Sequence, residues 1–380
     1  MMSTDYSRKA IRTGSAYLPL HGGSAPRWLF KRMVSLSKAI CEVLVFEYGR
    51  KELLRRLSDP WWFQAFSCVL GFDWHSSGTT TVTCGALKEA LRDAEIGIRL
   101  AGGKGSTSRK TPSQIVEMGT ELSLSTASIE TLQRASRLSA KVDNAALQDG
   151  YQLYHHVLIF TEEGDWAVIQ QGMNPTAQYA RRYHWLSENL QSFVDEPHTS
   201  IVGEKRHDVV LDMTAGKSAD ARAGTVSLFN EKPEWLQRQF KRIKMPFQAT
   251  LYDLGRVKLP PELCMPKRIN WDAVRAAYEF SPKGYEEVLE IRGMGPGTVR
   301  ALALISSLVY GSKISWEDPL KYTFTVGGKD GVPYPVNRKV MDRAIEVLQK
   351  GIKEAKIGRK EQLRALRRLE EFVPEGKMFI

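Results

Sequence analysis

Histidine is the side chain best suited to acid–base chemistry and metal binding near neutral pH, and its distribution in this chain is uneven. All seven histidines lie between positions 21 and 207: His21, His75, His155, His156, His184, His198 and His207. The C-terminal third of the chain has none. This asymmetry suggests that the region before position 214 carries out the chemistry and that the C-terminal part holds the substrate.

Two of these histidines belong to a predicted β hairpin. Segments 154–161 and 166–173 are rich in β-branched and aromatic residues and flank a turn at 162–165. Because side chains alternate along a strand, each strand presents one His or one Gln to each face, at the end away from the turn. Polar side chains are costly to bury without partners, so we expect either solvated strand ends or a polar site. The candidate catalytic residues here are His155, His156, Gln170 and Gln171, with Asp165 as a candidate carboxylate.

Two further clusters could act on a phosphate. Asp73 and His75 lie in a polar break, where they could orient water or a metal ion, or simply cap a helix start. Segment 178–185, predicted as a helix, brings two arginines close to an aromatic ring, which suits a phosphate and an adjacent base. The alternative is an ordinary amphipathic helix with exposed arginines. The candidate residues of this helix are Arg181, Arg182 and His184.

Residues 289–311 resemble the helix-hairpin-helix motif of DNA-binding and DNA-repair proteins. An apolar helix end, a Gly-Met-Gly turn and a second apolar helix follow one another. Glycines permit unusual backbone angles and close approach of a phosphate, and the amides that begin the second helix favour negative charge. Such a contact reads the backbone rather than the bases; the alternative is a hairpin used only for packing. The expected nucleic-acid contacts are Gly293, Met294, Gly295, Gly297, Thr298 and Arg300, with Lys104 and Arg338 elsewhere.

The composition fits a globular, basic protein. Fifty-four Lys and Arg residues stand against 43 Asp and Glu, a net charge of +11, which indicates an anionic partner such as DNA or, alternatively, only a solvated basic surface. The cysteines, Cys41, Cys68, Cys84 and Cys264, form no close pair, which fits a cytoplasmic protein. Neither a secretion signal nor a membrane span is expected.

The remaining elements are predicted from periodicity and turn signals. Helices are expected over 27–48, 79–93 and 111–140, a helix start at Ser58-Asp59-Pro60, and a strand over 208–213. Residues 102–110 read as an exposed basic loop and residues 214–232 as a flexible connection. Lys104 lies between glycines but lacks the Walker spacing, so no nucleotide cofactor is expected.

Strings along most of the chain resemble the family catalogued as domain of unknown function 763, which is found mostly in archaea. The strings are Thr13-Gly14, Leu18–Gly23, Ala25–Leu29, Leu57–Pro60, Cys68–Gly78, Gln170–Met173, Arg181–Trp185, Gly327–Gly331 and Pro335–Arg338. The resemblance implies one continuous architecture and a cytosolic prokaryotic setting. It implies little about chemistry.

A weaker resemblance is to helix-hairpin-helix DNA glycosylases, whose catalytic aspartate follows the hairpin. Asn337, in a Val-Asn-Arg string, is too far downstream and is not a carboxylate. Asp318 is a substitute, although its helix-cap-like setting beside Pro319 favours a structural role.

These observations predict an α+β protein. Residues 1–213 would form a catalytic region with a small β hairpin or sheet, residues 214–250 a connection, and residues 251–380 a helical helix-hairpin-helix module. The expected function is a DNA-binding protein of DNA processing or repair, foremost a nuclease assisted by a divalent metal, Mg²⁺ or Mn²⁺. A DNA glycosylase and a non-catalytic DNA-structure binder or repair scaffold are the alternatives.

Overall fold

The computed structural model describes residues 25–70, 77–92, 94–174, 179–203, 205–244 and 263–323. Three of the candidate site residues, Asp73, His75 and Arg338, lie outside these ranges, as does the Lys- and Arg-rich segment 350–368. No helix within the described ranges is long and apolar enough to cross a membrane.

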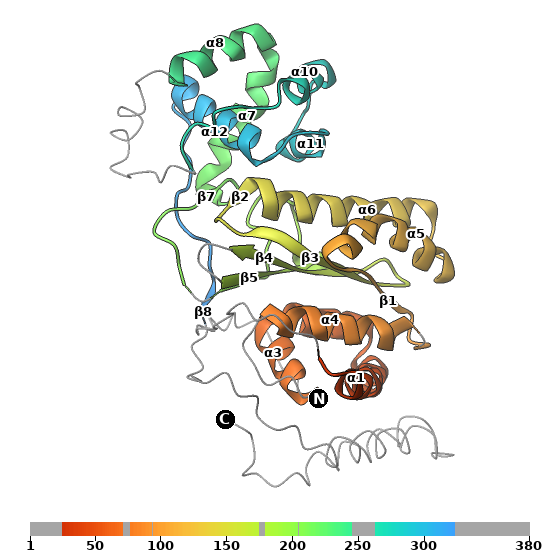
Figure 1. Ribbon diagram of the computed structural model, residues 1–380. Coiled ribbons are helices and arrows are strands. Elements are labelled where there is room, and N and C mark those ends of the chain that lie inside the picture. The colour runs from red at the N-terminus through yellow and green to blue at the C-terminus, as the bar shows by residue number, and fades with distance from the viewer. Residues whose placement is uncertain are drawn as a thin grey trace, which may run out of the picture.

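A six-stranded sheet forms the centre of the molecule (Figure 1). Its strand order is β1-β3-β4-β5-β6-β8, and every neighbouring pair is antiparallel except β6 and β8. The strands are β1 (Ile98–Lys104), β3 (Gln152–Thr161), β4 (Trp166–Asn174), β5 (Tyr179–Leu186), β6 (Ser200–Gly203) and β8 (Tyr322–Thr323). A second, two-stranded ladder joins β2 (Leu147–Gln148) to β7 (Leu211–Asp212). The predicted hairpin is confirmed as β3 and β4, but it belongs to a larger sheet than expected.

The N-terminal helices cover one face of this sheet. They are α1 (Arg27–Tyr48), α2 (Arg50–Ser58), α3 (Pro60–Val69) and α4 (Ser77–Arg92). Their apolar sides share one core with sheet residues such as Val157 and Ile169. The predicted helix start at Asp59 is confirmed, because its carboxylate accepts the amides of Trp61 and Trp62 at 2.8 and 2.9 Å.

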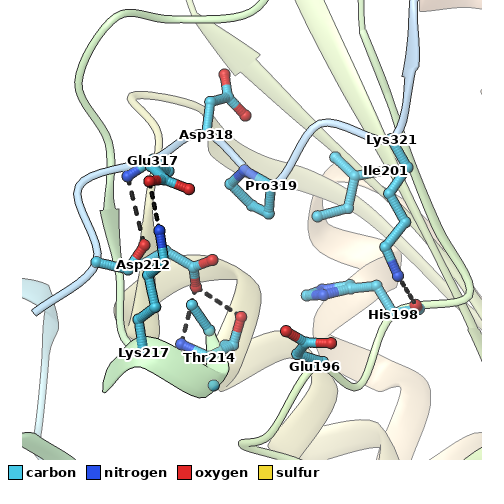
Figure 2. A pocket seen from close by; sticks show the side chains of 13 residues that line it. Glu196, His198, Ile201, Asp212, Thr214, Lys217, Glu317, Asp318, Pro319 and Lys321 are labelled. Carbon is cyan, nitrogen blue, oxygen red and sulfur yellow. Dashed lines mark hydrogen bonds and ion pairs between the residues drawn. The ribbon is translucent and has the colours of Figure 1, made fainter. Parts of the chain in front are cut away.

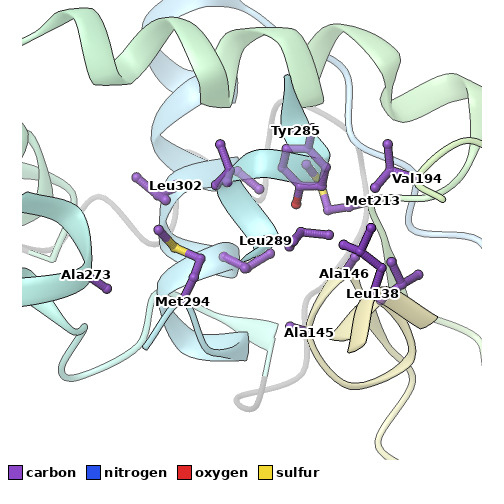
Figure 3. Packing of buried hydrophobic residues seen from close by; sticks show 14 of the residues in the cluster. Leu138, Ala145, Ala146, Val194, Met213, Ala273, Tyr285, Leu289, Met294 and Leu302 are labelled. Atoms are coloured by element: carbon purple, nitrogen blue, oxygen red, sulfur yellow. The ribbon is translucent and has the colours of Figure 1, made fainter. Parts of the chain in front are cut away.

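The opposite face carries two helical layers. Helices α5 (Thr111–Glu121) and α6 (Thr126–Lys141) and a π-helical turn, Val142–Ala146, lie next to the sheet. Beyond them lie α7 (Ala219–Ser227), α8 (Pro233–Lys244), α10 (Trp271–Phe280), α11 (Tyr285–Glu290) and α12 (Pro296–Tyr310) (Figure 1). Figure 3 shows how these layers meet: Leu289 and Met294 point into the same cluster as Ala145 and Ala146 of the π turn. One hydrophobic core therefore crosses the predicted domain boundary at residue 214.

Several predicted elements differ from the structure. The expected helix over 111–140 is two helices, because Ser123 adopts a left-handed conformation (φ 58°) and Ser125 caps a new helix by accepting the Ser128 amide. Segment 178–185 is not a helix but the central strand β5. The segment 214–232 is not a flexible connection, since α7 packs closely on α12.

The contact between α7 and α12 gives a stability prediction. A Cβ on Gly224 of α7 would come within 2.1 Å of the Ser306 hydroxyl and 2.8 Å of the Ser312 hydroxyl. We expect Gly224→Ala to lower the free energy of unfolding by about 1–3 kcal/mol through overpacking. Urea denaturation measures this change.

Gly85 of α4 supplies the matched control. A Cβ there meets only the Phe30 ring, at an ordinary 3.6 Å. Gly85→Ala should therefore raise the free energy of unfolding by about 0.4–1 kcal/mol. If Gly224→Ala instead stabilised the protein as much as Gly85→Ala, α7 and α12 would not be in close contact in solution.

Candidate functional site

The strand register divides the predicted catalytic residues between the two faces of the sheet. His155 lies opposite Gln171, and Gln171 opposite Arg182. The next row, on the other face, aligns His156 with Gln170. The predicted pairing of a His with a Gln across the hairpin is thus confirmed, but the two pairs face away from each other.

Asp165 and the two arginines do not gather with these pairs at one cleft. Asp165 lies in the β3–β4 turn, at the far end of the hairpin, where it pairs with Lys51 at 3.2 Å. Arg181 and Arg182 are neighbours on a strand and so point to opposite faces; both are 0 % exposed. The candidate residues therefore form two separate buried clusters rather than one cleft.

On the face toward α6, a chain of hydrogen bonds leads to Asp143. The Ser136 hydroxyl and the His156 Nε2 are 2.8 Å apart, and His156 Nδ1 is 2.9 Å from the Gln170 amide oxygen. Gln170 then donates from Nε2 to Asp143 at 2.6 Å. Since the amide oxygen can only accept, His156 must donate from Nδ1 and accept from Ser136 at Nε2. Burial lowers the pKa of His156, which fits this neutral form.

Asp143 is the organising group of this cluster. Its carboxylate also accepts the Trp185 indole N–H at 3.0 Å and pairs with His198 through Nε2. Sequence reasoning missed Asp143, and it counted His198 among the histidines without assigning it a role. The two residues are 55 positions apart, and no local pattern marks them as partners.

Arg181, on the same face, is the centre of a buried ion-pair network. It contacts Asp149 at 3.0 Å and holds Asp318 with two bonds of 3.0 and 2.8 Å. Asp318 also accepts the backbone amides of His207 and Leu320. With these four bonds Asp318 has a structural role, and it presents no free oxygen to a glycosylase substrate.

On the face toward α2–α4, a row of polar side chains crosses four strands. The register aligns Lys104, His155, Gln171 and Arg182. Lys104 is exposed and lies over the Tyr154 ring, whereas Arg182 is fully buried. No carboxylate within the described chain forms an ion pair with Arg182.

The neighbours of Arg182 are neutral. Its Nε donates to His184 Nε2 at 2.9 Å, its guanidinium also reaches the Thr80 hydroxyl at 3.3 Å, and it lies 4.7 Å from the Phe63 ring centroid. Burial lowers the pKa of Arg182 to about 10. Burial and the nearby Arg182 charge hold the pKa of His184 well below its usual range, so its imidazole is the neutral acceptor.

The α11–α12 hairpin presents its turn to solvent. Arg292, Gly293 and Pro296 are exposed, and Gly293 adopts a positive φ of 87°. Met294 is buried in the core and anchors the turn (Figure 3). The turn is therefore an exposed bend on a rigid base.

Two of the predicted nucleic-acid contacts have structural partners instead. The Thr298 hydroxyl accepts the Asn270 amide at 3.1 Å. Arg300 donates to the Cys264 carbonyl at 2.9 Å and to the Gln148 amide oxygen at 2.7 Å. Lys104, at the end of β1, is not part of the hairpin.

A pocket of about 230 Å³ lies beside β7 and was not predicted (Figure 2). It is lined by Glu196, His198, Ile201, Asp212, Thr214, Ala215, Gly216, Lys217, Ser315, Glu317, Asp318, Pro319 and Lys321. Among the described residues, no group of three or more His, Cys, Asp or Glu side chains is placed to hold a metal ion.

Comparison with known proteins identifies a family that covers most of the chain. The family described as "Protein of unknown function (DUF763)" matches residues 14–336. No curated protein and no solved structure matches the chain.

The two arginines give a paired stability prediction. Arg181→Met leaves the buried carboxylates of Asp149 and Asp318 without their cation, and we expect a loss of about 3–5 kcal/mol in the free energy of unfolding. Arg182→Met removes a buried charge that has no carboxylate partner, and it should cost far less. Urea denaturation of both variants measures the difference. Similar losses would mean that Arg182 has a counter-charge in solution.

His155 gives a pH prediction. Burial, with a smaller effect of His156 and Lys104, lowers its pKa to about 3. The unfolded chain takes up this proton near pH 6.5 and the folded chain does not, so stability falls as the pH drops from about 6.5 toward 3. His155→Leu should reduce that slope by about 1.4 kcal/mol per pH unit between pH 6 and 4. Denaturation at several pH values measures the slope, and an unchanged slope would contradict the burial of a neutral His155.

Proposed function

The chain belongs to the DUF763 family, and we propose that it is a DNA-binding protein of DNA processing or repair. In this proposal the turn between α11 and α12 binds the phosphate backbone of DNA in the manner of a helix-hairpin-helix motif. The contact would recognise DNA structure rather than base sequence.

The main observation that supports the proposal is the exposed turn at the start of α12. Within the described chain, the amides of Gly297 and Thr298 have no hydrogen-bond acceptor. Helix α12 is 15 residues long, and its dipole favours an anion at this end. A phosphate at the turn would accept these amides.

Positive side chains flank the turn. Lys267, Arg268 and Arg292 are exposed. The Arg268 carbonyl lies only 3.8 Å from the position of a Cβ on Gly297, which places this residue beside the turn. Such a cluster supplies the counterion-releasing contacts that dominate affinity for DNA.

Of the three roles considered, the described residues support a DNA-structure binder best. The catalytic candidates His155, His156, Arg182 and His184 are almost fully buried, and all but His156 lie on the sheet face away from the α11–α12 hairpin. Phosphodiester hydrolysis with Mg²⁺ or Mn²⁺ is the alternative. Labelled single-stranded, duplex and branched DNA, incubated with either metal, should be shifted but remain intact; strand cleavage would establish the nuclease.

Substitutions around the turn test DNA binding. Gly295 has ordinary backbone angles (φ −89°, ψ 174°), and a Cβ there meets nothing closer than 4.0 Å. Gly295→Val should therefore fold normally, obstruct the phosphate and weaken binding of a labelled duplex by about tenfold or more. Gly293 is unsuitable for this substitution, because a Cβ there would lie 2.4 Å from the side-chain amide nitrogen of Asn270.

Charge-reversal variants provide a second test of DNA binding, with a matched control. Arg268→Glu and Arg292→Glu should weaken binding. They should also flatten the plot of log affinity against log salt concentration, whose slope is roughly −0.9 per neutralised phosphate. Arg92→Glu, an exposed site on α4 across the sheet, should leave binding almost unchanged. Salt-insensitive binding, or equal loss in all three variants, would count against the hairpin as the contact surface.

A further inference from the structure

The pocket beside β7 has no part in the proposed DNA contact. It is enclosed by the end of β7, by residues 196–201, by the turn at 214–217 and by residues 315–321 (Figure 2). Its volume is below the range of most pockets for drug-sized ligands. Only a compact molecule or a single side chain would fit inside.

His198 lines this pocket with a buried ring. Its Nε2 pairs with Asp143, a carboxylate that can only accept, so Nε2 carries the proton. The ring also packs edge-on against Trp185, at a centroid distance of 4.6 Å. Nδ1, the other ring nitrogen, has no hydrogen-bond partner among the described residues. His198 is only 6 % exposed, so the orientation of its ring is fixed by the fold.

Asp212 is a buried carboxylate at the same pocket. One of its oxygens accepts the amide and the hydroxyl of Thr214, at 2.8 and 2.6 Å. It is 3 % exposed and forms no ion pair within the described residues. Burial raises its pKa, with the hydrogen bonds from Thr214 opposing this. A buried carboxylate without a cation is costly, and a cation in the pocket would relieve that cost.

The other charged groups that line the pocket already have partners. Lys217 pairs with Glu317 at 2.6 Å, and Asp318 pairs with Arg181. Lys321 donates to the His198 carbonyl at 3.0 Å.

Glu196 adds a further carboxylate. It is held in a left-handed conformation (φ 44°) and forms no ion pair in the part of the chain described. Two lysines line the pocket, but Asp212 and Glu196 are carboxylates that no ion pair among the described residues includes.

We propose that this pocket binds a compact organic cation, a primary amine or a guanidinium group. Its N–H groups would donate to Asp212 and to Glu196, and its charge would balance the buried carboxylate. The same chemistry could come from a free small molecule or from a lysine side chain of a partner protein.

Titration calorimetry on the full chain tests the proposal. The probes are putrescine and agmatine as free amines, N-acetyl-lysine methylamide as the lysine side chain, and inorganic phosphate as the opposite charge. We expect one of the cationic probes to bind and phosphate not to bind. Binding of the free amines alone identifies a small molecule, and binding of the lysine derivative alone identifies a protein partner. Phosphate binding, or no binding of any amine, overturns the proposal.

Three variants tie the signal to the pocket. Asp212→Asn keeps the shape and the acceptor for Thr214 but removes the charge, and it should weaken amine binding by about tenfold or more. Glu196→Gln, at an exposed position, should weaken binding as well and serves if Asp212→Asn fails to fold. Glu163→Gln, in the β3–β4 turn, is the control and should bind like the unmodified protein. Unchanged affinity in both pocket variants overturns the proposal.

Discussion

The buried pairing of Arg181 with Asp149 and Asp318 is the interaction on which the rest of the structure depends. It connects the central strand β5 to two segments that are distant in the sequence. Removal of one partner would leave an uncompensated charge in the interior. The resulting loss of stability is far larger than the net stabilisation that the intact pair contributes. The pairing therefore fixes where these segments can lie.

The position of the hairpin follows from this pairing. Asp149 comes directly after Gln148, whose amide donates to the Pro296 carbonyl at 2.8 Å and accepts from Arg300. The first turn of α12 is thus connected through Gln148 to the neighbouring Asp149, which Arg181 of the sheet holds in place. Asp318 similarly fixes the segment that closes the pocket beside β7. The proposed DNA contact and the proposed cation pocket are separate, but both depend on the same buried arginine.

Local sequence patterns were enough to predict elements whose signals are local. The helix over 27–48, the capped start at Asp59 and the β3–β4 hairpin were all predicted correctly, since periodicity, a capping side chain and a turn sequence lie within a few residues of one another. The contact between His and Gln across the hairpin followed from strand alternation alone. The distribution of these pairs over two faces also follows from that alternation, but their burial does not.

The failures came from interactions between distant residues. Segment 178–185 suggests an amphipathic helix because adjacent arginines are expected in solvent, and only Asp149 and Asp318 explain why Arg181 can lie in a buried strand. The helix α7 was missed because its small residues suggest a loop until Gly224 is seen against Ser306 of α12. His198 could not be singled out, since its partner Asp143 lies 55 positions earlier.

The central claim, that the amides at the start of α12 bind a DNA phosphate, can be tested directly by nuclear magnetic resonance. The backbone amide signals of Gly297 and Thr298 are followed while a short duplex is added at low salt. The account predicts that these two signals shift first, saturate with the duplex and return when salt is added. Shifts confined to other surfaces, with both amides unmoved at saturation, would contradict it.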